Sequence, residues 1–195
     1  MMTPITGGVN ARERILAAAR HLFCQHGISA TGIDTIIEAS GTAKATLYKT
    51  FGSKDGLVEA VLDAEGIAWR TWFFGELDRL RGQPGHQIVA VFTILEKWFA
   101  DERFTGCPFI NAVGEFDKRD DRYRAIALAH KSQVIARLTE MARRAGATTP
   151  AKVAHEIGLL IDGAIVAAMV TGDPKVARTA KSAARKVVDG LKVPA

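Results

Sequence analysis

The stretch ATLYKTFGSKDGL, residues 45–57, decides how this chain folds, because one helical pattern ends and another begins within it. Ala43, Leu47 and Phe51 recur every four residues, so they form one apolar side of a short helix. Tyr48 and the lysine beside it then lie on the opposite side. The glycine and serine that follow are typical of a helix end and of the N-cap of a new helix. The stretch therefore predicts a short helix with a cationic, aromatic outer face.

Helical periodicity continues along the chain, without the sustained alternation of apolar and polar residues that is typical of strands. Glycines, prolines and N-cap residues divide the pattern into about nine helices, so we predict an all-α fold. The expected helices cover residues 10–26, 31–40, 43–51 and 53–80, and further helices begin at residues 84, 108, 122, 150 and 173. Three short helices thus precede a larger bundle, which suggests one domain over residues 1–55 and another over residues 56–195.

The second and third expected helices are joined by a tight turn that contains a glycine. This pattern matches a helix-turn-helix unit, whose second helix enters the major groove of DNA. On that helix Lys44 and Lys49 can neutralise phosphates, and the Tyr48 hydroxyl can donate to a phosphate. Thr46 flanks this face, and Lys54 lies in the next helical turn, where backbone N–H groups favour a phosphate. The alternative is a solvated helix with a chance tyrosine.

The stretch from Arg12 to Leu62 resembles the DNA-binding head of TetR-family transcriptional regulators. The residues that carry the resemblance are Ile15, Leu16, Ala18, Ala19, Leu22, Phe23, Gly27, Ile36, Gly41, Thr46, Leu47, Tyr48, Phe51, Ser53, Lys54, Asp55 and Leu57. The resemblance implies that one group of side chains lies nearest the bases: Thr42, Lys44, Ala45 and Thr46. It implies that a second group contacts the DNA backbone: Thr31, Tyr48, Lys49 and Lys54.

Two helix caps are expected in this head. Thr31 and Asp34 have the spacing of an acidic capping box at the start of the second helix. Ala43 stands where the family usually has a serine cap, so we expect Thr42 to cap the third helix instead. Two further departures from the family pattern are Ala45 and Thr50.

The resemblance also implies a function: a repressor that a small-molecule effector releases from double-stranded operator DNA. Residues 1–56 contain six lysines and arginines and four acidic residues, a net charge of +2, so a single head would bind weakly. A homodimer would present two heads to half-sites roughly 34–36 Å apart. We expect dimerisation through the two helices that begin near residues 150 and 173, since small residues around Asp162 allow another helix to approach closely.

Aromatic residues gather in the second domain, where they form either an ordinary core or the lining of a small-molecule pocket with a few polar groups. The candidate ligand-binding residues are Trp69, Trp72, Phe73, Trp98, Phe99, Cys107, Phe109, Asn111, His130, Gln133 and Asp162. Cys107 precedes a proline at an expected helix start, where the helix dipole lowers the pKa of a thiol. The alternative function is therefore a thiol-based redox or electrophile sensor, against a plain buried cysteine.

Missing motifs and the overall composition exclude several other classes of protein. The sequence shows no metal-ligand spacing, nucleophile elbow, phosphate loop or dinucleotide fingerprint, so we expect neither an enzyme nor a bound cofactor or metal. A net charge of +5 and a pI near 9.4 are compatible with a polyanionic partner. Two cysteines are too few for a disulfide framework. No uninterrupted apolar run approaches the roughly 20 residues that span a bilayer. We therefore expect a cytoplasmic protein without a membrane segment.

Overall fold

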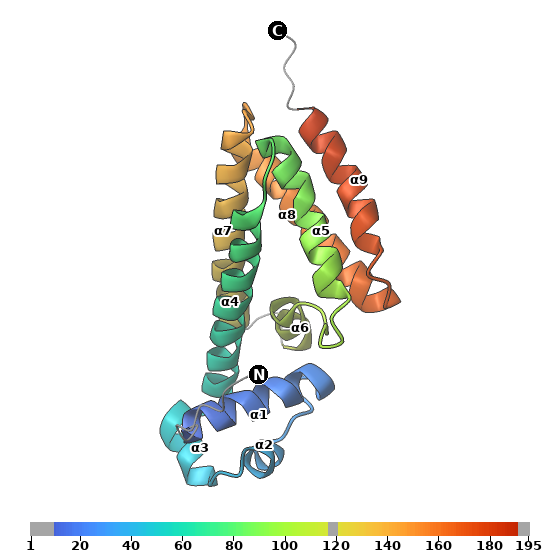
Figure 1. Cartoon of the computed structure of the whole chain (residues 1–195). Coiled ribbons are helices and arrows are strands. Elements are labelled where there is room, and N and C mark those ends of the chain that lie inside the picture. Colours follow the sequence, from blue (N-terminus) through green and yellow to red (C-terminus); the bar gives the residue numbers. More distant parts are fainter. Residues whose placement is uncertain (1–9, 117–120, 191–195) are drawn as a thin grey trace, which may run out of the picture. The chain divides into compact units, whose positions relative to one another are not determined.

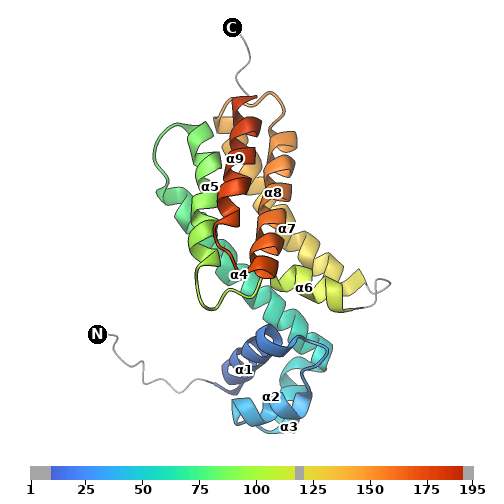
Figure 2. The same cartoon turned by 90° about the vertical axis from the view of Figure 1, so that its right-hand side faces the viewer.

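The structure is a computed structural model that describes residues 10–116 and 121–190. Within those residues it contains nine α-helices and no strand, which confirms the predicted all-α fold (Figures 1 and 2). The helices are α1 Ala11–His26, α2 Ile33–Ser40, α3 Lys44–Phe51, α4 Lys54–Arg79, α5 Pro84–Phe99, α6 Pro108–Glu115, α7 Asp121–Arg144, α8 Pro150–Thr171 and α9 Val176–Asp189.

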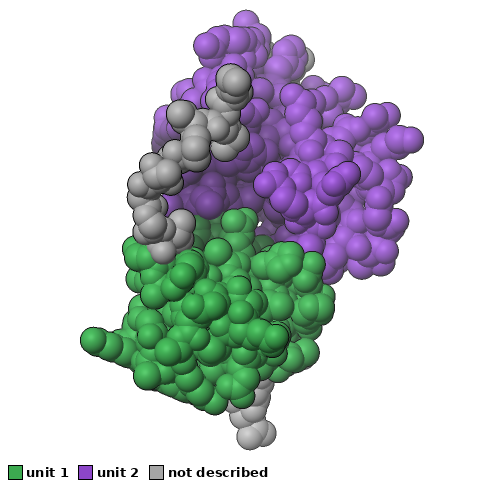
Figure 3. Space-filling model, turned by 60° about the horizontal axis from the view of Figure 1, so that its bottom comes forward, with its two compact units in different colours: residues 1–65, 108–123 green, residues 66–107, 124–195 purple. Residues whose placement is uncertain are grey.

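The helices group into two compact units, coloured separately in Figure 3. Unit 1 comprises the chain up to Glu65 together with Pro108–Tyr123, and unit 2 comprises Gly66–Cys107 and the chain from Arg124 onward. The boundary within α4 thus lies ten residues beyond the functional division expected after residue 55. Unit 1 also includes α6, which the sequence placed in the second domain.

Unit 1 is built around a small apolar core to which each of its first four helices contributes. Ile15 and Ala19 of α1, Ile36 of α2, Leu47 of α3 and Leu57 of α4 are all completely buried. Helix α1 begins with a capping box between Asn10 and Glu13. The apolar side of each short helix therefore faces this core, as the four-residue spacing requires.

Hydrogen bonds and an ion pair join α6 and the start of α7 to the rest of unit 1. The Glu115 carboxylate accepts a hydrogen bond from the Ser29 backbone N–H at 2.9 Å. Asp55 in the first turn of α4 accepts a hydrogen bond from the Tyr123 hydroxyl at 3.1 Å and pairs with Arg122 at 2.7 Å. Burial and the Asp55 carboxylate raise the pKa of Tyr123, so this hydroxyl remains a donor.

Unit 2 contains α5, α8 and α9 packed together, with the second half of α4 beside α7 (Figures 1 and 2). The buried side of α9 consists of small residues: Ala177, Ala180 and Ala184. Its flank is held to α5 by Arg178, which pairs with Glu96 at 2.7 Å. Small side chains permit this close approach of two helices.

Several helix starts differ from the sequence-based expectation. Helix α2 begins at Ile33 with Gly32 as its N-cap and no side-chain cap, so the predicted capping box at Thr31 is wrong. Helix α3 also lacks a side-chain cap, because the Thr42 hydroxyl bonds the Ser40 hydroxyl at 2.8 Å. The predicted cap of α4 is confirmed: Ser53 Oγ accepts the Gly56 N–H at 3.0 Å.

Candidate functional site

Helices α2 and α3 form a helix-turn-helix in unit 1, with Gly41 at the turn. Gly41 has a left-handed backbone conformation, with φ of 59°, which few residues other than glycine adopt readily. Its N–H and that of Thr42 donate to the carbonyls of Glu38 and Ile37 at the end of α2. The chain turns here, and only three residues, 41–43, separate the end of α2 from the start of α3.

The outer face of α3 carries most of the predicted DNA contacts. Leu47 is completely buried and fixes the helix to the core, whereas Tyr48 is 44% exposed. The other residues of the predicted set on α3 are Lys44, Ala45 and Lys49, which are exposed, and Thr46, which is half-buried. The predicted inward side was right for Leu47 and wrong for Ala43, which is exposed at the start of the helix.

Lys44 is already engaged within the head. Its Nζ donates to Asp34 of α2 at 2.8 Å, and both side chains are exposed. This hydrogen bond and the charge of Asp34 raise the pKa of Lys44. A phosphate bound by Lys44 must therefore compete with Asp34. In contrast, Lys49 and Lys54 form no ion pair with any residue in the described part of the chain.

Thr31 is not available as a phosphate contact through its side chain. The residue is buried, and its hydroxyl donates to the Gly27 carbonyl at 2.6 Å. Gly27 caps the end of α1, so Thr31 ties the α1–α2 turn to that end. Thr42 is half-buried with its hydroxyl bonded to Ser40, and it lies at the turn rather than on the outer face of α3.

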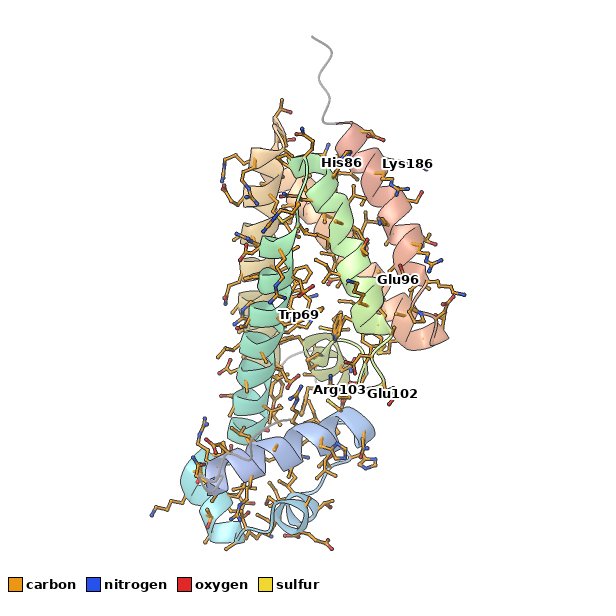
Figure 4. The ribbon with its side chains drawn as sticks, viewed as in Figure 1. Trp69, His86, Glu96, Glu102, Arg103 and Lys186 are labelled. Atoms are coloured by element: carbon orange, nitrogen blue, oxygen red, sulfur yellow. The ribbon has the colours of Figure 1, made fainter. Side chains whose placement is uncertain are left out.

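Unit 2 contains a cluster of aromatic side chains centred on Trp69, which faces α5 from α4 (Figure 4). Its ring stacks on Phe73 with 4.5 Å between ring centroids and meets Trp98 of α5 edge-on at 5.6 Å. His130 of α7 lies 5.5 Å from the same ring. We call the connected rings the aromatic cluster; they are Trp69, Trp72, Phe73, Phe74, Trp98, Phe99, Phe104 and His130.

The cluster contains polar groups with unusual surroundings. The Trp69 indole N–H is buried and has no hydrogen-bond acceptor among the described residues. Arg70 donates to His130 Nδ1 at 2.7 Å. Burial, then Arg70 and Lys131, lower the pKa of His130 to about 4, so its ring is neutral near pH 7. Because an arginine can only donate, Nδ1 must accept and Nε2 carries the ring proton.

The remaining predicted ligand residues lie elsewhere. Phe109 is buried and Asn111 half-buried on α6, which belongs to unit 1. Cys107 is buried in unit 2. Gln133 is exposed, with its amide directed to the Ala129 carbonyl of its own helix. Asp162 forms an ion pair with Lys131 that joins α8 to α7.

Sequence reasoning missed Arg70. An arginine between two tryptophans could have indicated a binding site. Its hydrogen-bond partner His130, however, lies 60 residues further along the chain. No described carboxylate pairs with Arg70, so its positive charge remains uncompensated within the described residues.

Helix α8 has an exposed apolar side. Leu159 and Val170 are 73% and 74% exposed, and Val166 between them is also exposed. Gly163 lies on the same side, where an added Cβ would meet no atom within 4 Å. Helix α8 is also the one described helix long and apolar enough to cross a membrane, yet Ile157, Ile161 and Ile165 on its other side are buried. It therefore combines a core side with an uncovered apolar side.

Comparison with known families gives matches over both units. The model of "Bacterial regulatory proteins, tetR family" matches residues 15–61, and that of "Tetracyclin repressor-like, C-terminal domain" matches residues 84–184. The structure is similar to SCO4454, a TetR-family regulator of Streptomyces coelicolor, with a TM-score of 0.84, 28% identity and coverage of 94% of this chain and 96% of that one. A regulator of Streptomyces avermitilis gives a TM-score of 0.80 at 26% identity, covering 95% and 100% of the chains.

The curated relatives match over shorter stretches. The transcriptional repressor ComR of Escherichia coli is 46% identical over 52 residues, which are 27% of this chain and 25% of ComR. The regulator QacR of Staphylococcus aureus is 32% identical over 62 residues, or 32% of this chain and 33% of QacR. This chain thus matches only a quarter to a third of the length of these two relatives.

Proposed function

Because the chain belongs to the tetR family of bacterial regulatory proteins, we propose that it is a dimeric, DNA-binding transcriptional regulator, acting as a repressor that a small molecule releases from operator DNA. The observation that carries the proposal is the outer face of α3. Tyr48 and Lys49 are exposed there, next to a completely buried Leu47. A helix held in this way can present a phosphate contact and an aromatic ring to the major groove.

In this proposal Lys49, Lys54 and the Tyr48 hydroxyl contact the DNA backbone, while Ala45 and Thr46 lie nearest the bases. Ala45 has the small side chain that close approach of a helix to base edges requires. Lys44 contributes after it exchanges Asp34 for a phosphate. We leave the Thr31 side chain out of the contact set, since its hydroxyl is already bonded to Gly27.

Fluorescence anisotropy on DNA from upstream of the gene tests the assignment. We expect salt-sensitive binding that Tyr48→Ala combined with Lys49→Ala reduces by at least about 100-fold, since phosphate contacts supply much of the affinity. Lys186→Ala, at an exposed position on α9, is the control for the lost positive charge and should leave binding unchanged. Unaltered affinity of the double variant would refute these contacts.

The proposed effector site is the aromatic cluster, and α4 is its connection to the head. Trp69 and Arg70 lie on the same continuous helix as Asp55, which bonds Tyr123 and Arg122 in unit 1. A ligand that binds better to one arrangement of α4 than to another would shift the population of head positions. Operator affinity would then fall when the effector binds.

We propose that the dimer forms mainly through α8, with α9 and Leu128 of α7 at the margin. Leu159, Val166 and Val170 supply an exposed apolar strip, and Gly163 permits close helix approach. The outer residues of α9 include Thr179, Ser182 and Arg185, which are polar. The apolar contribution therefore comes from α8, although the sequence suggested both helices equally.

Size-exclusion chromatography with light scattering tests this surface. Leu159→Glu places a carboxylate in the proposed apolar contact, so we expect the dimer to become a monomer at micromolar concentration. Gln25→Glu, which adds the same charge at an exposed position of α1, should remain dimeric. A dimeric Leu159→Glu variant would argue against α8 as the interface.

Ligand binding is favoured here over thiol sensing. Cys107 is only 6% exposed, which restricts access of an oxidant or electrophile to its sulfur. We expect Cys107→Ser to retain operator binding and its release by the effector. Loss of oxidant-induced release in this variant alone would favour the thiol sensor. A cytoplasmic location follows from the proposed contact with operator DNA.

A further inference from the structure

We propose that the aromatic cluster binds a molecule with an aromatic body and a carboxylate, and that the carboxylate is held by Arg70 and the Trp69 indole N–H. This inference rests on the effector site of the proposed function and names its ligand class. It starts from two donors in unit 2: the Trp69 indole N–H, which has no acceptor among the described residues, and the Arg70 guanidinium, which has no anionic partner among them.

The first donor is the buried Trp69 N–H, which no described residue satisfies. Burying a donor without an acceptor is unfavourable, so tryptophan N–H groups in protein interiors usually have a partner. A ligand oxygen at this position would remove the cost. The indole therefore favours ligands that accept a hydrogen bond.

The second donor is the Arg70 guanidinium, which is half-buried and has no carboxylate partner among the described residues. Arg70 donates instead to the neutral ring of His130, which accepts a hydrogen bond but supplies no negative charge. A half-buried arginine in such surroundings favours an anion, because charge-assisted hydrogen bonds are about twice as strong as neutral ones. Nearby Lys131 is already paired with Asp162.

Trp69 and Arg70 follow each other on α4, yet both side chains reach His130. The Trp69 ring lies 5.5 Å from the imidazole, and Arg70 bonds Nδ1 at 2.7 Å. The Trp69 ring and the Arg70 guanidinium thus both lie beside His130. A guanidinium fork and one indole N–H suit the two oxygens of a carboxylate, whereas a phosphate would demand more donors.

The rest of the ligand is predicted from the rings around these donors. Trp72 is 36% exposed, and Trp69 and Trp98 are only partly buried, so the cluster presents aromatic surface to solvent. The three ring centroids lie 5.6–6.2 Å from one another. Such a surface favours a flat, aromatic body over an aliphatic or strongly polar one.

Three probes that differ only in their head group test the proposal on the full-length chain: cinnamate, cinnamamide and cinnamylamine. The chain has three tryptophans, and all three belong to the cluster, so each indole N–H signal in a nitrogen-15 NMR spectrum reports on this site. We expect cinnamate to bind at least about tenfold more tightly than cinnamamide, and cinnamylamine to bind most weakly. The Trp69 N–H signal should move downfield with cinnamate.

Arg70→Gln should abolish the preference for cinnamate while leaving the affinity for cinnamamide within about twofold. Arg144→Gln removes the same charge at an exposed position of α7 and should keep the preference. Trp69→Phe should weaken cinnamate binding several-fold. Equal binding of cinnamate and cinnamamide, a preference that survives in Arg70→Gln, or no cinnamate binding up to its solubility would overturn the proposal.

Operator binding of the same samples separates this inference from the proposed function. A chain that binds operator DNA but shows no carboxylate preference contradicts only the ligand class. A chain that prefers cinnamate but binds no upstream DNA supports the ligand class and contradicts the proposed function.

Discussion

The helix-turn-helix and the aromatic cluster differ in how far apart in the sequence their parts lie. The residues that position Tyr48 come from one local stretch, since Leu47 packs in a core formed within residues 15–57. The cluster instead joins Trp69 to Trp98 and Arg70 to His130, across three helices. A local arrangement can be recognised from the spacing of apolar residues in the sequence. A long-range arrangement depends on how the helices pack against one another.

Truncating Leu47, which fixes α3 to the core, should have the largest effect on stability. Leu47→Ala deletes most of a completely buried side chain, so we expect unfolding to become easier by about 2–5 kcal/mol and operator binding to be lost. The measurement is urea unfolding followed by far-UV circular dichroism. Tyr48→Ala is the matched change on the exposed side and should cost under about 1 kcal/mol. Equal costs for the two variants would contradict the division of α3 into a core side and an outer side.

The long-range site should respond to acid through His130. Its folded-state pKa is about 4, below the ordinary 6.5, because burial and then the charges of Arg70 and Lys131 disfavour the protonated ring. The unfolded chain therefore takes up the proton first as the pH falls. The contribution of neutral His130 to the free energy of unfolding is therefore fully present above about pH 6.5 and is lost as the pH falls toward 4.

His130→Gln isolates this contribution, since the variant has no imidazole to titrate. Between about pH 7 and pH 4.5, we expect wild type to lose about 1–2 kcal/mol more than the variant, a value reduced for partial solvent screening. Urea unfolding at both pH values gives the comparison. Parallel losses in the two proteins would show that His130 is not held neutral by its surroundings.

Removing the hydrogen bond between the start of α7 and Asp55 should have an intermediate effect on stability. Tyr123→Phe removes the hydroxyl that donates to Asp55, so we expect a loss of about 0.5–1.5 kcal/mol in unfolding free energy. Arg122→Gln removes the exposed ion pair to the same carboxylate and should cost less, under about 1 kcal/mol. The reverse order would show that the ion pair, and not the buried hydroxyl, joins the segments.

The smallest predicted effect concerns competition for Lys44. Asp34→Asn removes the carboxylate that now pairs with this lysine, so we expect operator affinity to rise about twofold to fivefold. Asp63→Asn makes the same charge change at an exposed position of α4 and serves as the control. If both variants bind alike, the gain comes from net charge and Lys44 has no particular role.

The sequence predicted the local site well, but not its hydrogen bonds. Apolar spacing predicted the buried position of Leu47 and the exposed position of Tyr48, and the serine pattern predicted the cap at Ser53. The prediction that Thr31 caps α2 is wrong, because the Thr31 hydroxyl donates to the Gly27 carbonyl, four residues earlier in the chain. A short polar side chain has several backbone partners within reach, and spacing cannot choose among them.

For the long-range site the sequence predicted which residue types gather, but not all of their neighbours. Trp69 and Phe73 fall on one side of α4 because they are four residues apart, and the structure places Trp98 beside them. Gln133 lies on the exposed side of α7, whereas His130 lies on the buried side. Which side of α7 meets α4 depends on how the helices pack, so a single sequence could not separate these two.

Hydroxyl-radical footprinting of the full-length chain on its upstream DNA tests the central claim, that a dimer reads DNA through α3. We expect two protected half-sites centred about one helical turn apart, roughly 34–36 Å, or a multiple of it. Both should disappear together in the double variant Tyr48→Ala and Lys49→Ala. A single protected segment, or two that persist in the double variant, would contradict the account.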